Sequence, residues 1–183
     1  MAGFCIALGY LAFIRITGTA PTEWGSFNNF LGGALFPVGL IALTFVGGEL
    51  ATGNMMVMTL GVLQKKVRVG ALCYNWLVVL LTNCLGGFLV AYLFGHIVGL
   101  TEGAFLDKTV AVAQAKIADP PLVAFVSGIG CNIFVCLAVY LGALAKSYLG
   151  KMFGLWFPVM VFVVCGFQHV VANEIGRASC RER

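Results

Sequence analysis

One stretch decides the fold: LFPVGLIALTFVGGELATGN, residues 35–54. It begins as an apolar run and then places three glycines and the acidic Glu49 within residues 46–54. Glycine weakens a helix by ~1 kcal/mol relative to alanine, and irregular backbone at membrane depth must face protein or a water-filled cavity. We therefore predict that residues 47–53 form a non-helical loop facing a pore. The alternative interpretation is that these glycines only permit close helix packing. That interpretation leaves a carboxylate in the membrane unexplained.

A second stretch, WFPVMVFVVCGFQHVVAN at residues 156–173, repeats this pattern. Both stretches contain Phe-Pro-Val, run apolar to a glycine and then become polar. The corresponding residues are Gly48 and Gly166, Glu49 and Gln168, and Asn54 and Asn173. The last two pairs are 119 residues apart and the Phe-Pro pairs 121, so the match needs a two-residue slip.

Composition indicates that lipid is the solvent for much of the surface. Apolar residues make up 61% of the chain, charged residues only 10%, and the mean hydropathy is +1.00, whereas soluble domains are about 25% charged. The net charge of +4 is not clustered on one face, which argues against nucleic-acid binding. Six apolar segments of span or half-span length are predicted at residues 2–16, 29–47, 54–64, 69–98, 121–145 and 152–166.

Loop charges predict the orientation of these segments. The loops QKKVR (64–68) and AKSYLGK (145–151) are basic, whereas loops 15–28 and 99–120 balance basic against acidic residues. Basic loops stay in the cytoplasm, so the two similar stretches cross the membrane in opposite directions. A repeat of opposite polarity, interrupted at membrane depth, is typical of a transport pathway at the repeat interface. We expect a multi-pass protein of the plasma (inner) membrane.

Several motifs resemble those of the formate/nitrite transporter family: FPVGLIALTFVGGELATGN, CNIFVCLAVYLG, GKMFGLWFPVMVFV and GFQHVVAN. They occur in order over nearly all of residues 3–173. The resemblance implies an all-α membrane protein, an aquaporin-like inverted repeat of six helices with helices two and five broken. It also implies homopentamers with a pore through each protomer, passing small monovalent anions such as formate, nitrite or hydrosulfide, with no cofactor.

The resemblance also assigns roles to residues. His169 would be the central pore histidine and Thr52 its hydrogen-bonding neighbour. An outer constriction would comprise Phe36 and Phe162, an inner one Leu40 and Leu50, and the outer vestibule Lys116 and Asn132. The family commonly has glutamate before the histidine, where this chain has Gln168, so a carboxylate role in setting the proton affinity of His169 is in doubt.

The residues themselves support a proton relay. Glu49, Gln168 and His169 are polar groups within apolar segments, and such groups are functional candidates. Histidine exchanges protons near neutral pH, and apolar rings on either side would block a bare anion but not a neutral weak acid. Lys116 would concentrate anions at the mouth.

Two other functions share parts of this pattern. An aquaporin-like channel for small neutral solutes would carry paired Asn-Pro-Ala motifs, which the sequence lacks. A membrane redox subunit would need histidines at matched depths for haem, but His96 lies near the end of its segment and His169 in the middle. The cysteines form no Cys-x-x-Cys or Cys/His cluster, so we predict no metal site.

The last ten residues, EIGRASCRER (174–183), differ sharply in composition from the rest. They match an in-frame translation of a sequencing adapter, and we expect a non-native tail there. Residues 1–173 would then form a partial transporter-like domain truncated before helix six.

Overall fold

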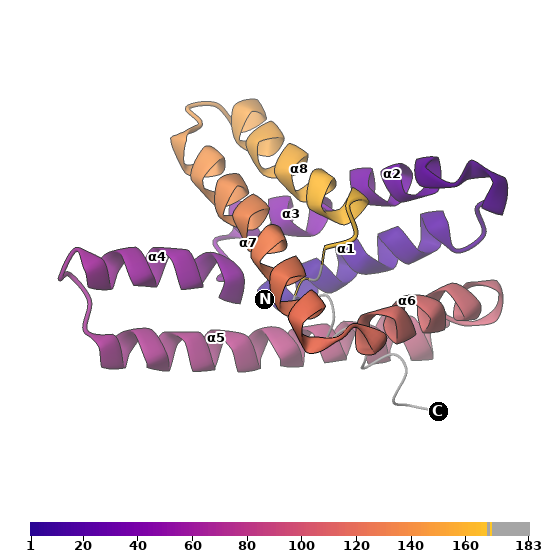
Figure 1. Cartoon of the computed structure of the whole chain (residues 1–183), viewed down its shortest axis with the longest axis horizontal. Coiled ribbons are helices and arrows are strands. Elements are labelled where there is room, and N and C mark those ends of the chain that lie inside the picture. Colours follow the sequence, from indigo (N-terminus) through magenta and orange to yellow (C-terminus); the bar gives the residue numbers. More distant parts are fainter. Residues whose placement is uncertain (168, 170–183) are drawn as a thin grey trace.

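A computed structural model describes residues 1–167 and 169, without the side chains of Thr22, Lys116 and Ile117. The elements are α1 (Ala2–Thr17), η1 (Thr22–Trp24), α2 (Ser26–Leu35), α3 (Val38–Val46), α4 (Ala51–Leu63), α5 (Val69–Val90), η2 (Ala91–Ile97), η3 (Gly103–Phe105), α6 (Leu106–Ala118), α7 (Pro121–Leu144) and α8 (Tyr148–Val164). Figure 1 shows α1 near the centre, with α5 on one side and α2, α3 and α8 on the other. The prediction of an all-helical membrane protein is confirmed.

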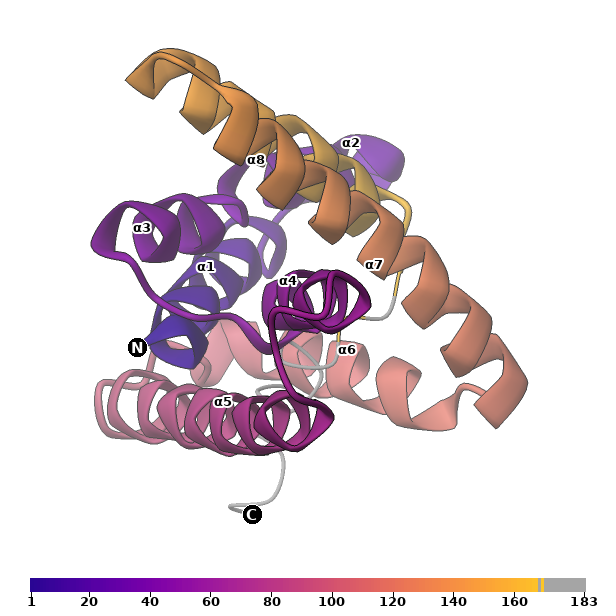
Figure 2. The same cartoon turned by 90° about the vertical axis from the view of Figure 1, so that its left-hand side faces the viewer.

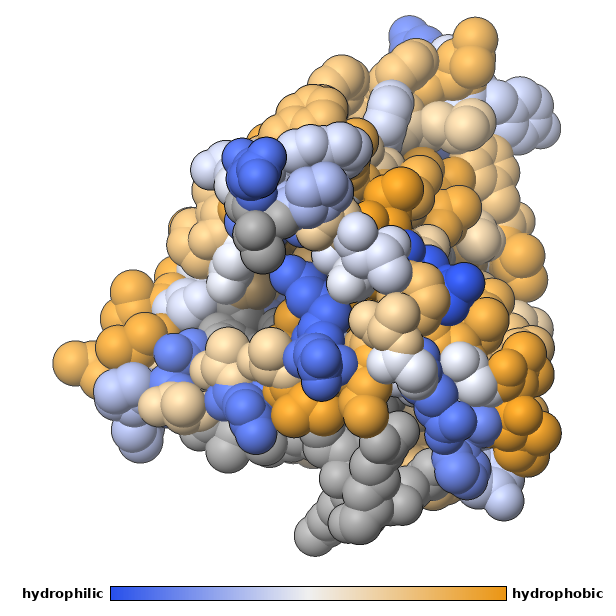
Figure 3. All heavy atoms as spheres, turned by 90° about the vertical axis from the view of Figure 1, so that its right-hand side faces the viewer, coloured by the Kyte–Doolittle hydropathy of each residue, from blue (hydrophilic) through white to orange (hydrophobic). Residues whose placement is uncertain are grey.

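Three helical stretches are long and apolar enough to cross a membrane: Ser26–Val46, Val69–Ile97 and Pro121–Leu144. The first comprises α2 and α3, because Phe36 and Pro37 keep right-handed backbone angles between them. Large apolar side chains cover the outside of the longer helices, including Leu122 at 73% and Tyr74 at 71% exposure. Figure 3 shows polar side chains gathered at the end where α2 and α6 begin, between apolar flanks.

Helix α1 holds the bundle together by backbone-to-backbone packing. A Cβ at Gly9 would lie 2.6 Å from the Phe36 carbonyl oxygen, and one at Gly39 would lie 2.5 Å from that of Cys5. On the opposite side, a Cβ at Gly3 would collide with the backbone carbonyl of Asn83. These small residues let α3 and α5 approach α1 more closely than larger residues would permit.

The two similar stretches run in opposite directions, as predicted. Phe45 near the end of α3 stacks on Tyr148 at the start of α8, with ring centroids 5.9 Å apart. At the other end, Gly33 in α2 lies against Val164, the last residue of α8. The span formed by α2 and α3 and the helix α8, which carry the two stretches, are therefore antiparallel. Helices α7 and α8 form a hairpin, and α4 lies between α5 and α7 (Figure 2).

The segment 99–120, predicted as a loop, contains the helix α6, so this prediction was wrong. Residues 106–118 are too polar to read as a span but form an amphipathic helix against the bundle. Preceding residues anchor it: the guanidinium of Arg15 lies 3.7 Å from the centroid of the Phe105 ring. Such a cation–π contact contributes about 0.5–2 kcal/mol.

Gly39→Ala should destabilise the fold, because the new methyl would meet the backbone of Cys5 at 2.5 Å and of Ile6 at 3.0 Å, and neither can rotate away. Overpacking of this kind costs about 1–3 kcal/mol, so the melting temperature in detergent should fall by roughly 2–10 °C. Gly128→Ala in α7 is the matched control, since a methyl added there would have no neighbouring atom within 4 Å. Equal melting temperatures for the two variants would contradict the packing described above.

Candidate functional site

Helix α3 ends at Gly47, which adopts a left-handed conformation with φ 78°. The Gly48 N–H donates to the Leu43 carbonyl at 2.7 Å, and the Gly47 N–H to the Thr44 carbonyl at 3.3 Å. This is the Schellman closure that glycine favours at helix ends, because glycine carries no Cβ to strain a positive φ. It satisfies two carbonyls that would otherwise be left unpaired in the membrane.

Helix α4 begins again after only four residues, so the predicted non-helical loop at 47–53 was too long. Leu50 is extended and Ala51 is the first helical residue. The Asn83 side chain on α5 supplies the cap, because its Oδ1 accepts from the Ala51 N–H at 3.1 Å and its Nδ2 donates to the Glu49 carbonyl at 3.1 Å. This pairing lets the helix start early and places Thr52 in its first turn.

The second break has the same closure as the first. Helix α8 ends at Val164, Gly166 is left-handed with φ 73°, and the Phe167 N–H donates to the Phe162 carbonyl at 3.1 Å. Gly47 and Gly166, rather than Gly48 and Gly166, are therefore the equivalent glycines. They are 119 residues apart, the same separation as Glu49 and Gln168. The two-residue slip thus falls between each Phe-Pro pair and its glycine.

The two breaks meet at Thr52 and His169. Thr52 is 1% exposed and His169 is 3% exposed, and the Thr52 Oγ1 lies 3.4 Å from the His169 Nε2. The Phe162 ring stacks on the imidazole with centroids 5.8 Å apart, and Phe36 packs edge-on against Phe162 at 5.9 Å. A titratable group is thus enclosed between a hydroxyl and two aromatic rings.

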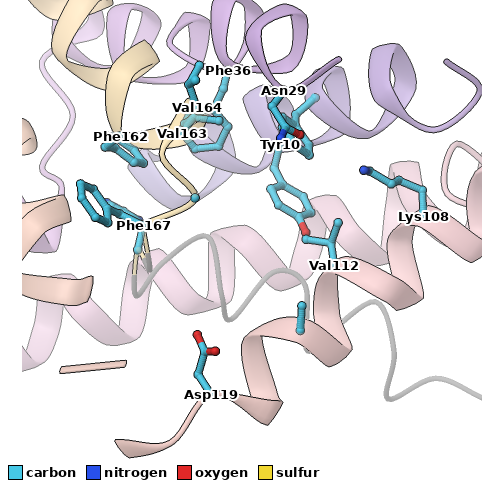
Figure 4. Close-up of a pocket in the computed structure, with 14 residues that line it drawn as sticks. Tyr10, Asn29, Phe36, Lys108, Val112, Asp119, Phe162, Val163, Val164 and Phe167 are labelled. Atoms are coloured by element: carbon cyan, nitrogen blue, oxygen red, sulfur yellow. The ribbon is translucent and has the colours of Figure 1, made fainter. Parts of the chain in front are cut away.

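An outer cavity of about 380 Å³ opens on one side of this group. Its lining comprises Tyr10, Phe13, Asn29, Phe36, Lys108, Val112, Ala115, Asp119, Phe162, Val163, Val164, Gly166, Phe167 and His169. Figure 4 shows Lys108 pointing toward Asn29, with Asp119 at the opposite edge of the cavity. Residues 108, 112 and 115 recur at helical spacing on one face of α6, and Asp119 directly follows the helix. This spacing is a signal that could have identified Lys108 from the sequence.

A second cavity of about 220 Å³, here called the inner cavity, has Leu40 and Leu50 in its wall. The other lining residues are Leu43, Thr44, Gly48, Gly53, Asn54, Val139, Gly142, Ala143, Lys151 and Leu155. Leu40 and Leu50 are 3% and 5% exposed. The residues predicted for the outer and inner constrictions therefore line different cavities, each of which also contains one lysine.

The remaining predicted site residues lie elsewhere or outside the described residues. The Glu49 carboxylate is exposed and accepts hydrogen bonds from Asn54 Nδ2 at 2.7 Å and Asn75 Nδ2 at 3.3 Å. The Asn132 amide donates to the Gly128 carbonyl of its own helix at 2.8 Å. Lys116 lies in α6, but its side chain is outside the described part, as are Gln168 and the predicted tail at 174–183.

Comparison with known proteins identifies the family. The formate/nitrite transporter family model matches residues 1–176. The chain is 51% identical to the uncharacterized transporter YrhG of Bacillus subtilis, over 94% of this chain and 65% of that protein. It is 46% identical to the formate channel BtFdhC of Bacillus thuringiensis, over 94% of this chain and 67% of that protein. The chain therefore belongs to the formate/nitrite transporter family, and it spans about two thirds of the length of these relatives.

Solved structures show the same fold. An FNT family ion channel superposes with a TM-score of 0.89 at 28% identity, covering 98% of this chain and 70% of that one. A pentameric formate channel with formate bound superposes with a TM-score of 0.82 at 29% identity, covering 95% and 69%. The arrangement of broken helices in this chain is thus similar to that of channels in the family.

Water should reach the outer cavity but not the lipid-facing side of α7. In a cysteine-depleted variant, Val112→Cys, which lines the cavity, should react with a charged methanethiosulfonate reagent. Ile133→Cys, in the middle of the span Pro121–Leu144, should react at least about tenfold more slowly, because lipid or another copy of the chain would cover this exposed apolar position and exclude the charged reagent. Mass spectrometry of the protein in liposomes measures both rates. Faster labelling at residue 133 than at residue 112 would mean that the cavity is not part of an aqueous path.

Proposed function

We propose that this chain forms the pore of a channel for small monovalent anions, with formate as the first candidate. The observation that carries the proposal is the convergence of two broken membrane helices on the buried Thr52–His169 pair. The relatives named as formate channels support the choice of substrate. Cavities on the two sides of the pair give the proposed path an entrance and an exit.

The apolar walls suggest how a proton enters the mechanism. A bare carboxylate would lose hydration between Phe36 and Phe162, which offer no hydrogen bond in return. A neutral acid crosses the same rings at much lower cost. His169 lies directly behind them, and histidine is the side chain that can exchange a proton near neutral pH, so we assign it the proton relay. Thr52 would orient the imidazole through its hydroxyl.

The exposed apolar surface suggests that lipid and other copies of the chain surround the pore. Helices α5 and α7 carry large exposed apolar side chains along their length, which lipid or another copy of the chain would cover. We propose a homopentamer in the plasma (inner) membrane, following the pentameric formate channel that shares the fold. The basic loops at 64–68 and 145–151 would face the cytoplasm.

His169→Phe should reduce formate uptake by at least about 100-fold, because general acid–base groups typically contribute that much. His169→Asn keeps a hydrogen-bonding partner for Thr52 but cannot exchange a proton, so formate leak should persist without proton movement. The assay uses proteoliposomes with a trapped pH dye. Because the chain spans two thirds of its relatives, the protein tested is residues 1–173 joined to the uncovered part of BtFdhC, here called the extended chain.

His96→Asn is the matched control, since His96 is a half-exposed histidine that is paired with Glu102 at 3.0 Å and lines neither of the two cavities described above. It should transport as the unmodified extended chain does. If His169→Asn moved formate and protons together at the original rate and pH dependence, the histidine would be structural only. Equal flux of glycerol and formate would instead indicate a channel for neutral solutes.

Lys108 should attract anions into the outer cavity, and Asp119 should oppose it, because both line that cavity with opposite charges. Lys108→Gln should lower uptake at low formate concentration by about threefold to tenfold, and Asp119→Asn should raise it. Both effects should vanish near 1 M salt, where the screening length is about 3 Å. Effects of the same sign from both substitutions, or effects insensitive to salt, would exclude this electrostatic role.

A further inference from the structure

Asn83 is a buried polar residue that sequence reasoning did not identify. It lies in α5 within the span Val69–Ile97, and its side chain is 2% exposed. Its amide bonds to backbone on both sides of Leu50: it donates to the Glu49 carbonyl and accepts from the Ala51 N–H, each at 3.1 Å. The peptide segment carrying Leu50 is therefore held at two adjacent points.

An amide side chain at position 83 fits the two backbone groups better than other side chains would. The segment presents one acceptor and one donor, and an amide offers the complementary donor and acceptor on a single rigid group. An aspartate would keep the acceptor for Ala51 but would present a second acceptor to the Glu49 carbonyl. A leucine of similar size would leave both backbone groups without this partner.

Helix α5 is packed closely against α1 beside the Asn83 amide. A Cβ at Gly3 would collide with the Asn83 carbonyl, and one at Gly86 would lie 2.8 Å from the Phe4 nitrogen. Helix α5 therefore meets α1 in backbone contact at the level of Asn83. A rigid anchor of this kind can define the position of whatever it binds.

We infer that Asn83 is a positioning residue for the inner constriction, holding Leu50 opposite Leu40 and thereby setting which anions pass. Leu50 lines the inner cavity and Thr52 follows two residues later in the same clamped segment. This inference rests on the proposed function, because it treats the inner cavity as part of an anion path. It goes further by assigning size selectivity to a residue that lines neither cavity.

The first measurement does not depend on transport. Leu50→Cys, 5% exposed when clamped, should react slowly with a small aqueous thiol reagent in the cysteine-depleted extended chain. Adding Asn83→Leu should speed this reaction by at least about tenfold, because the freed backbone groups turn toward water in the cavity. Thr82→Val is the matched control, since Thr82 is the exposed neighbour and its hydroxyl donates to carbonyls of its own helix. It should leave the rate unchanged.

The second measurement is the ratio of formate to acetate uptake. The two anions differ by one methyl group, a difference that a tight apolar site discriminates by about 10–200-fold. Asn83→Leu should reduce this ratio by about tenfold, mainly by admitting acetate, while Thr82→Val should preserve it. Asn83→Asp retains the bond from Ala51 and should give a smaller change in the same direction. It also provides a second test if Asn83→Leu does not reach the membrane.

The outcomes separate this inference from the proposed function. Faster labelling of Leu50→Cys in a protein that moves no formate would support the positioning role and reject formate as substrate. Unchanged labelling and an unchanged uptake ratio, in either folded Asn83 variant, would overturn the positioning role even if formate transport is confirmed. A loss of stability without a change in either readout would identify Asn83 as purely structural and would also overturn it.

Discussion

Backbone hydrogen bonding at the helix breaks is the constraint on which the rest of the structure depends. A helix that stops inside a membrane exposes carbonyls and N–H groups that lipid cannot satisfy. At the first break, Gly47 turns the chain so that Gly48 and Gly47 cap the end of α3, and Asn83 caps the start of α4. Leaving the two groups that Asn83 binds unpaired would cost on the order of 2–6 kcal/mol. The break is therefore a stable part of the fold, because a side chain from another helix binds its backbone groups.

Repetition of this element brings the candidate site together. Gly166 repeats the left-handed turn of Gly47, and the two stretches run antiparallel. Residues just beyond each glycine consequently approach one another from opposite sides, which brings Thr52 and His169 within 3.4 Å. The two residues are 117 positions apart in the chain, so no local sequence motif contains both. Their meeting follows from the arrangement of the repeats.

Much of the fold could be predicted from apolar runs and glycines, because these features determine local structure directly. The spans and the two breaks follow from such signals, and the opposite orientation of the two stretches follows from the basic residues in the loops. Asn83 could not be predicted, because in LTNCLGG it is indistinguishable from a polar residue facing a neighbouring helix, and its partners are 32 and 34 residues away. Helix α6 was missed because its polarity resembles that of a loop. Which of Gly47 and Gly48 corresponds to Gly166 depends on their backbone angles, and the sequence of two adjacent glycines does not show which one is left-handed.

The start of α4 also bears on the proposed proton relay. The N–H groups of Thr52 and Gly53 precede the first intrahelical bond, which joins Asn54 to Leu50, so the positive end of the helix dipole lies beside His169. That end stabilises an anion. In the proposed cycle, formic acid that has crossed the outer rings would transfer its proton to the imidazole of His169, and the formate anion that results would be stabilised at the helix end. The break in helix two would thus serve the chemistry as well as the shape of the path, because only a helix that begins inside the membrane can present its positive end there.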